Sequence, residues 1–147
     1  SSHAVASHAA PFIRAMAAEL AADGDYDWRV APLAVVEQGR VAIGDEVGEI
    51  LGADCGVVLI GERPGLSSPD SLGLYLTWAP QVGVTDEKRN CISNVRPAGL
   101  AMADAARRLL HLLGTARRDQ TSGVMLKDRS DDAVLDHDTE QTNFLTR

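Results

Sequence analysis

The stretch Gly56-Val57-Val58-Leu59-Ile60, followed at once by Gly61-Glu62-Arg63-Pro64-Gly65-Leu66, decides the fold expected for this chain. A strand that is polar on neither face is typical of a parallel sheet covered by helices on both sides. The segment 61–71 contains two glycines and two prolines and reads as a loop. Sheets of this kind bind their ligands at the carboxyl ends of the strands. The loop is therefore the first place to look for a site.

The rest of the chain alternates helical and extended patterns around this strand. Apolar residues three and four apart predict helices, and runs of β-branched or alternating apolar residues predict strands. Helices are expected over His8–Ala22, Gly44–Gly52 and Leu100–Arg118, strands over Trp28–Val36 and Leu74–Ala79, a short extended piece over Val41–Ile43, and a loop over Gln81–Pro97. This order predicts an α/β layered domain with a mostly parallel sheet flanked by helices.

Composition argues against several classes of function. The 147 residues suit one domain, and the net charge of −7 comes without any basic cluster. Nucleic acid and anionic membrane surfaces are therefore not expected as partners. No apolar run reaches the 18 or so residues of a membrane span. Cys55 and Cys91 lack metal-ligand spacing, so two free thiols in a reducing cytosol are expected, with a disulfide between them as the alternative.

No self-contained catalytic or metal-binding motif is present. The chain has no Gly-x-Gly-x-x-Gly fingerprint, no phosphate loop and no nucleophile elbow. Glu62 and Arg63 follow a buried strand, where charges are costly unless they are paired or used. They form either a structural ion pair or a ligand contact. Cys91 is either a buried inert thiol or a thiol packed against a ligand.

Four blocks in order resemble the small subunit of ethanolamine ammonia-lyases and together cover residues 1–127. The blocks are Val41–Ala53, the loop Gly61–Leu66 followed by Ser71-Leu72, Cys91-Ile92-Ser93-Asn94, and Ser122-Gly123. The resemblance implies a Rossmann-like domain that clamps adenosylcobalamin against a large barrel subunit within a higher-order hetero-oligomer. It implies a lyase that converts ethanolamine to acetaldehyde and ammonia, located in the cytoplasm or inside a bacterial microcompartment.

By position within the matched blocks, the resemblance assigns cobalamin contacts to Val41, Glu62 and Cys91. Their neighbours Arg40, Arg63 and Ser93 are added as further contacts. No catalytic residue and no metal ligand is implied in this chain, which should be inactive alone because the cofactor supplies the difficult chemistry.

The resemblance also divides the chain into a cobalamin-binding domain, residues 1–127, and an acidic tail, residues 128–147. The family's strand before the helix His8–Ala22 is expected to be missing from the chain. The apolar face of this helix would then be only partly buried. Its residues are Phe12, Ile13, Met16 and Leu20.

Two other functions compete with this interpretation. The first is a stand-alone α/β binding module for a small anionic or nucleotide ligand, with the amides of Ser68–Ser71 at a helix start as the anion site. The second is a purely structural interaction domain.

Overall fold

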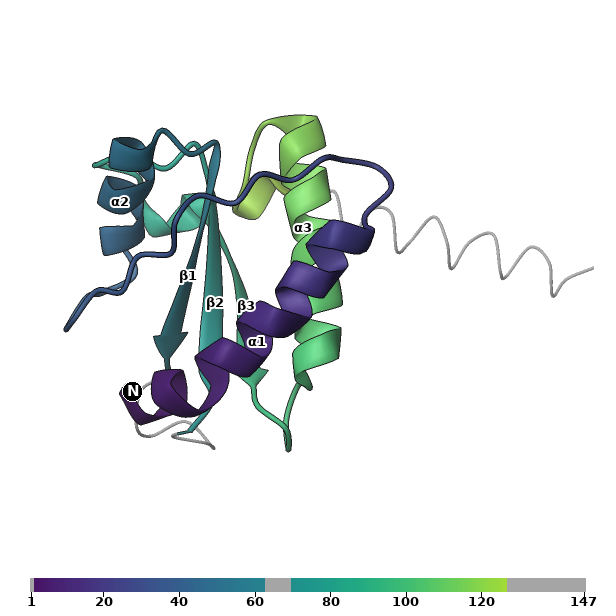
Figure 1. Ribbon diagram of the computed structural model, residues 1–147. Coiled ribbons are helices and arrows are strands. Elements are labelled where there is room, and N and C mark those ends of the chain that lie inside the picture. The colour runs from purple at the N-terminus through teal and green to yellow at the C-terminus, as the bar shows by residue number, and fades with distance from the viewer. Residues whose placement is uncertain (1, 63–69, 127–147) are drawn as a thin grey trace, which may run out of the picture.

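The structure, a computed structural model, describes residues 2–62 and 70–126 and contains one small sheet packed against helices (Figure 1). The elements in chain order are α1 (Ser2–Ala22), α2 (Ile43–Leu51), β1 (Cys55–Gly61), β2 (Leu72–Trp78), a 3-10 turn (Asp86–Lys88), β3 (Arg89–Val95) and α3 (Met102–Asp119). None of the helices within these residues is both long and apolar enough to cross a membrane.

The sheet has the order β1-β2-β3, and both pairs of strands are antiparallel. The predicted Rossmann-like, mostly parallel sheet is therefore wrong. The physical reason is that the chain turns back after β1 instead of crossing over through a helix, and the Glu62 amide donates to the Ser71 carbonyl at 3.0 Å as the chain returns. β1 is apolar on both sides because α1 packs against one face and α2 against the other.

One face of the sheet forms the hydrophobic core. Leu72, Leu74 and Leu76 alternate along β2 and are at most 1% exposed. They pack against Phe12 of α1 and Leu109 of α3, and Figure 1 shows both helices crossing this face. Residues on an antiparallel strand alternate between faces, so a single buried face fixes the register of the whole sheet.

The opposite face, called the outer face below, carries the alternate residues of each strand. They are Gly56, Val58 and Ile60 of β1, Gly73, Tyr75 and Thr77 of β2, and Arg89 and Cys91 of β3. α2 covers one end of this face by close backbone approach. A Cβ on Gly44 would lie 2.3 Å from a Val58 methyl, and a Cβ on Gly48 would lie 2.4 Å from the Pro80 ring.

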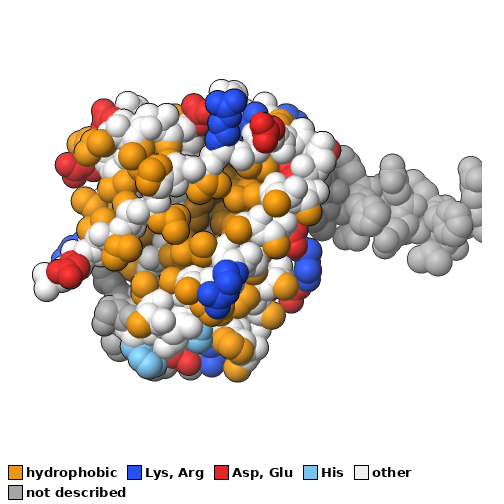
Figure 2. Space-filling model, viewed as in Figure 1, with side chains coloured by type: hydrophobic (Ala, Val, Ile, Leu, Met, Phe, Trp, Pro, Cys, Tyr) orange, Lys and Arg blue, Asp and Glu red, His pale blue; other side chains and the backbone are white. Residues whose placement is uncertain are grey.

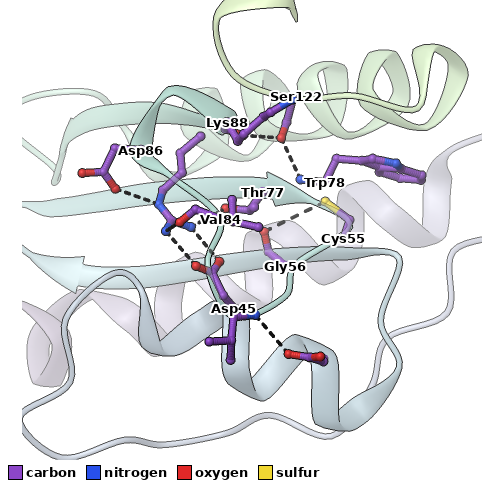
Figure 3. A network of polar contacts seen from close by, with 12 residues as sticks. Asp45, Cys55, Gly56, Thr77, Trp78, Val84, Asp86, Lys88 and Ser122 are labelled. Atoms are coloured by element: carbon purple, nitrogen blue, oxygen red, sulfur yellow. Dashed lines mark hydrogen bonds and ion pairs between the residues drawn. The ribbon is translucent and has the colours of Figure 1, made fainter.

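A buried ion pair fastens α2 to β3. The Asp45 carboxylate accepts from both terminal nitrogens of Arg89, at 2.6 and 2.7 Å, and the two side chains are only 5% and 4% exposed. The remaining Arg89 donors reach Asp86, Thr77 and the Val84 carbonyl, so all five N–H groups are used (Figure 3). These carboxylate partners raise the pKa of Arg89.

The segment after α3 is tied to the start of β3. The Asn90 side chain donates to the Gly123 carbonyl at 3.1 Å and accepts from the Gly123 amide at 2.6 Å. The Ser122 hydroxyl donates to the Lys88 carbonyl and accepts from the Trp78 amide, as Figure 3 shows. Gly123 has φ +88°, and a Cβ there would lie 2.0 Å from the Glu87 carbonyl oxygen.

The three predicted helices are confirmed, with α1 beginning earlier than expected. In α1, Phe12 and Met16 are buried, whereas Ile13 and Leu20 are half-buried. The predicted strands over residues 56–60 and 74–79 are confirmed as β1 and β2.

Three other local predictions are wrong. The segment 28–36 forms no strand, and its apolar side chains Val30, Leu33 and Val35 are 67%, 68% and 94% exposed. Residues 41–43 form a turn and the start of α2. The predicted loop 81–97 contains β3. Figure 2 shows hydrophobic side chains gathered on the face that carries α1 and the segment 23–42, with a hollow between them.

The two cysteines lie on opposite faces of the sheet. Cys55 packs towards the helices, whereas Cys91 is exposed on the outer face, and both are free thiols. Because their side chains point apart, the alternative of a disulfide between them is wrong.

We expect Asp45→Ala to lower the free energy of unfolding by about 3–5 kcal/mol, because it leaves the buried Arg89 charge without its main partner. Urea unfolding followed by circular dichroism measures the change. The control is Asp104→Ala, which removes an exposed pair with Arg107 and should cost little. Equal losses for the two variants would contradict the importance of the buried pair.

We expect Gly123→Ala to destabilise the chain far more than Gly52→Ala. Both glycines have positive φ, +88° and +64°, but a Cβ on Gly52 meets nothing within 4 Å. Gly52→Ala should therefore cost about 1–2 kcal/mol of backbone strain. Gly123→Ala should cost the same strain and, in addition, produce a steric clash with backbone atoms of Glu87 and Lys88. The same unfolding titration compares them, and similar midpoints would refute this account.

Candidate functional site

Three residues form a direct cross-strand row in the middle of the outer face. Val58 pairs with Tyr75, and Tyr75 pairs with Cys91. Adjacent strands lie about 4.8 Å apart, so the row spans roughly 10 Å of sheet. Its side chains are apolar or aromatic apart from the phenol and thiol groups, which makes this a weakly polar surface.

A β-bulge reshapes the next row. Leu74 pairs with Ile92 and Leu72 pairs with Val95, so Ser93 and Asn94 together oppose the single residue Gly73. Bulges add local twist and redirect side chains, often next to functional sites. The Cys91 sulfur and the Ser93 hydroxyl oxygen lie 3.4 Å apart, which places both groups on the same face.

The Glu62 side chain reaches over Gly73 towards Asn94. Its Oε1 accepts a hydrogen bond from the Asn94 amide, which joins the end of β1 to β3 across β2. A Cβ on Gly73 would lie 3.7 Å from the Glu62 Cγ, so the bare glycine leaves the space in which the carboxylate crosses. A carboxylate has about four acceptor positions. The contact with Asn94 therefore fixes Glu62 and leaves capacity for other donors.

Tyr75 also lies against Gly73. Its Cε2 would lie 3.2 Å from a Cβ on Gly73, so the ring leans along the strand over that glycine. The side chain is half-buried. Burial raises the pKa of Tyr75, and contact with Cys91 and the negative charge of Glu62 raise it further. The phenol therefore stays neutral over the whole physiological range of pH.

The turn before α2 carries two more of the predicted residues. The Arg40 and Val41 carbonyls accept from the Ile43 and Gly44 amides, at 3.0 and 3.1 Å. Gly44 rests on Val58, so this turn lies beside the row that contains Tyr75. Val41 is half-buried and Arg40 is exposed.

The structure therefore brings together on one face most of the residues that the resemblance assigned. Glu62, Cys91 and Ser93 share the outer face, and Val41 with Arg40 lies at its border. Arg63 and most of the loop proposed for an anionic ligand fall outside the described residues. Of the two interpretations of Cys91, the buried inert thiol is wrong because the side chain is exposed.

Sequence reasoning overlooked Gly73, Tyr75 and Val58. The signal was present in the alternation of β2, where Leu72, Leu74 and Leu76 mark one face and the residues between them mark the other. It could not be used before the neighbouring strand β3 was known.

The described residues offer little else for ligand chemistry. Within residues 2–62 and 70–126, no group of three or more His, Cys, Asp or Glu could hold a metal ion. An open cavity of about 510 Å³ lies between the end of α1 and the segment 23–30. Its aromatic walls are already engaged, because Arg117 stacks on Tyr26 and Trp28 at 4.4 and 5.1 Å from the ring centroids.

A family model and individual relatives both match this chain to the same family of proteins. Residues 1–127 match the family described as ethanolamine ammonia-lyase light chain (EutC). The chain is 58% identical over 142 residues to an ethanolamine ammonia-lyase small subunit of Ralstonia nicotianae, covering 97% of this chain and 51% of the relative. It is 59% identical over 133 residues to a small subunit of Azotobacter vinelandii, covering 90% of this chain and 48% of the relative.

A small subunit of Pseudomonas aeruginosa is 55% identical over 143 residues, covering 97% of this chain and 51% of the relative. The chain thus spans about half the length of the curated relatives it matches. Since the family match extends over residues 1–127 and includes every residue of the outer face, this chain belongs to the ethanolamine ammonia-lyase light-chain family.

Proposed function

We propose that this chain holds adenosylcobalamin against the large subunit of an ethanolamine ammonia-lyase, on the outer face of its sheet. The contacts are Val41, Glu62 and Cys91, with Arg40, Arg63 and Ser93 beside them. The observation that carries the proposal is the convergence of Glu62, Cys91 and Ser93, which are up to 31 positions apart in the sequence, on one weakly polar face.

The residues of this face fit the chemistry of a corrinoid. Cobalamin has a broad, flat and largely apolar macrocycle fringed by amide arms. Tyr75 and Cys91 offer a surface of matching character beside Val58, and Gly73 leaves room that a Cβ would fill for the Glu62 carboxylate and the Tyr75 ring to lie over the sheet. Sites for large cofactors are mostly apolar with a few well-placed polar groups.

The polar groups at the border suit the amide arms. The Glu62 carboxylate accepts hydrogen bonds from amide N–H groups, and the Ser93 hydroxyl both donates and accepts. Because the Asn94 amide already fixes Glu62, little side-chain entropy is lost when the carboxylate engages a ligand. When bound, the cofactor supplies the radical chemistry of the lyase, and this chain supplies binding and orientation.

The proposal makes this chain a binding subunit without catalytic residues. The conversion of ethanolamine to acetaldehyde and ammonia requires the large subunit, which carries the substrate site. The relatives are named small subunits, which supports a two-subunit enzyme. This chain alone should show no turnover.

Glu62→Gln should weaken adenosylcobalamin binding by the complex with the large subunit about 10- to 100-fold. Loss of a hydrogen bond to a charged group costs about 1.5–3 kcal/mol, and 1.4 kcal/mol is a factor of ten. The glutamine oxygen can still accept from the Asn94 amide, so stability should change little. Equilibrium dialysis with detection of corrinoid absorbance measures the affinity.

The control for this experiment is Glu19→Gln, which removes a carboxylate from α1 on the other side of the sheet. It should leave cofactor affinity unchanged. Unaltered affinity in Glu62→Gln would contradict the proposal and favour a purely structural role for the outer face.

Bound adenosylcobalamin should protect Cys91 of the complex from alkylation by iodoacetamide. Cys91 is exposed, whereas burial and the nearby Asp54 charge raise the pKa of Cys55 to about 12. Thiolates are the reactive species, so Cys55 stays unmodified at pH 8 and serves as an internal control. Peptide mass spectrometry of the complex with and without cofactor gives the rates, and identical rates for Cys91 would count against its assignment.

A further inference from the structure

We infer that Tyr75 is a further cofactor contact, and that its ring, laid over Gly73, forms the centre of the surface on which the corrin ring rests. The inference rests on the proposed function and adds to it a residue that the matched sequence blocks do not contain.

The position of Tyr75 carries the inference. It lies on the central strand, directly between Val58 of β1 and Cys91 of β3. One proposed contact, Cys91, is its cross-strand partner, and another, Glu62, lies like Tyr75 against Gly73. Tyr75 therefore lies next to both residues, and a ligand as broad as the corrin ring that touches Glu62 and Cys91 also reaches Tyr75.

Two neighbouring outer-face residues, Thr77 and Val58, are already engaged, which leaves Tyr75 as the aromatic side chain at the centre. Thr77 is 4% exposed and accepts from Arg89 at 3.0 Å. Val58 lies under Gly44 at the start of α2. Tyr75 is only half-buried although it lies mid-sheet. A half-buried aromatic residue with an apolar body and a polar tip is well suited to a mixed interface of this kind.

The position of the ring beside Gly73 supports the contact. Its edge lies next to Gly73, where a Cβ would come within 3.2 Å of Cε2. A side chain at position 73 would displace the ring, so the glycine lets the ring lean along the strand. The raised pKa of Tyr75 keeps the phenol uncharged, which avoids placing an anion beneath an apolar macrocycle.

The test compares Tyr75→Leu and Tyr75→Phe in the complex with the large subunit, with adenosylcobalamin as the probe and equilibrium dialysis as the readout. We expect Tyr75→Leu to weaken binding about tenfold, since it removes a large flat apolar contact. Tyr75→Phe keeps the ring and should stay within about twofold of the parent. Tyr26→Leu, at the other tyrosine of the chain, is the matched control and should bind as the parent does.

The outcomes separate this inference from the proposed function. Parental affinity in Tyr75→Leu together with a loss in Glu62→Gln would overturn the role of Tyr75 and leave the proposed function standing. Parental affinity in both variants would overturn the proposed function itself. An equal loss in Tyr75→Phe and Tyr75→Leu would overturn the assignment of the contact to the ring.

A second measurement uses the unmutated protein and so does not depend on how the variants fold. Nitration by tetranitromethane, mapped by peptide mass spectrometry, reports the accessibility of each of the two tyrosines. Saturating adenosylcobalamin should slow nitration of Tyr75 in the complex at least severalfold and leave Tyr26 unaffected. Unchanged nitration of Tyr75 would overturn the inference.

Discussion

The two-sided chemistry of the central strand is the constraint on which the rest of the structure depends. Leu72, Leu74 and Leu76 are sealed against α1 and α3, so a slip of one residue would expose all three. Their burial fixes the register of β2 and with it the opposite face. Gly73, Tyr75 and Thr77 are therefore placed on the outer face by the leucines, whatever they themselves bind.

The outer face is covered by α2 at one end and carries Glu62 near the other. At the end that α2 covers, Gly44 and Gly48 let the helix approach Val58 and Pro80 closely. The buried Asp45–Arg89 pair at this end satisfies its charges internally. Buried charges of this kind hold elements in place but contribute little to ligand binding, because every donor is taken. At the other end, Glu62 accepts from the Asn94 amide, and the Ser93 hydroxyl lies 3.4 Å from the Cys91 sulfur. One end of the outer face thus holds α2 in place, and the other end is the part proposed to bind the cofactor.

A surface of this kind suits a subunit that presents a cofactor to another protein. It is assembled from strands and is fixed by backbone hydrogen bonds, so its geometry does not depend on a ligand. Its polar groups are few and lie at the border. Under the proposed function, the cofactor supplies the radical chemistry and this chain supplies the surface.

The sequence by itself determined the helices, two of the three strands, and the residues proposed for the site. Helical spacing revealed α1, α2 and α3 because their apolar faces are continuous, and the two blocks that contain Glu62 and Cys91 pointed to the family. Only the tertiary structure decided the direction of the strands, the existence of β3 and the place of Tyr75. In β3 only Ile92 and Val95 are buried, so no alternation marks it, and an apolar run such as β1 looks the same in parallel and antiparallel sheets. Strand direction is set by where the chain returns after Glu62, and that is a property of long-range pairing which no local pattern encodes.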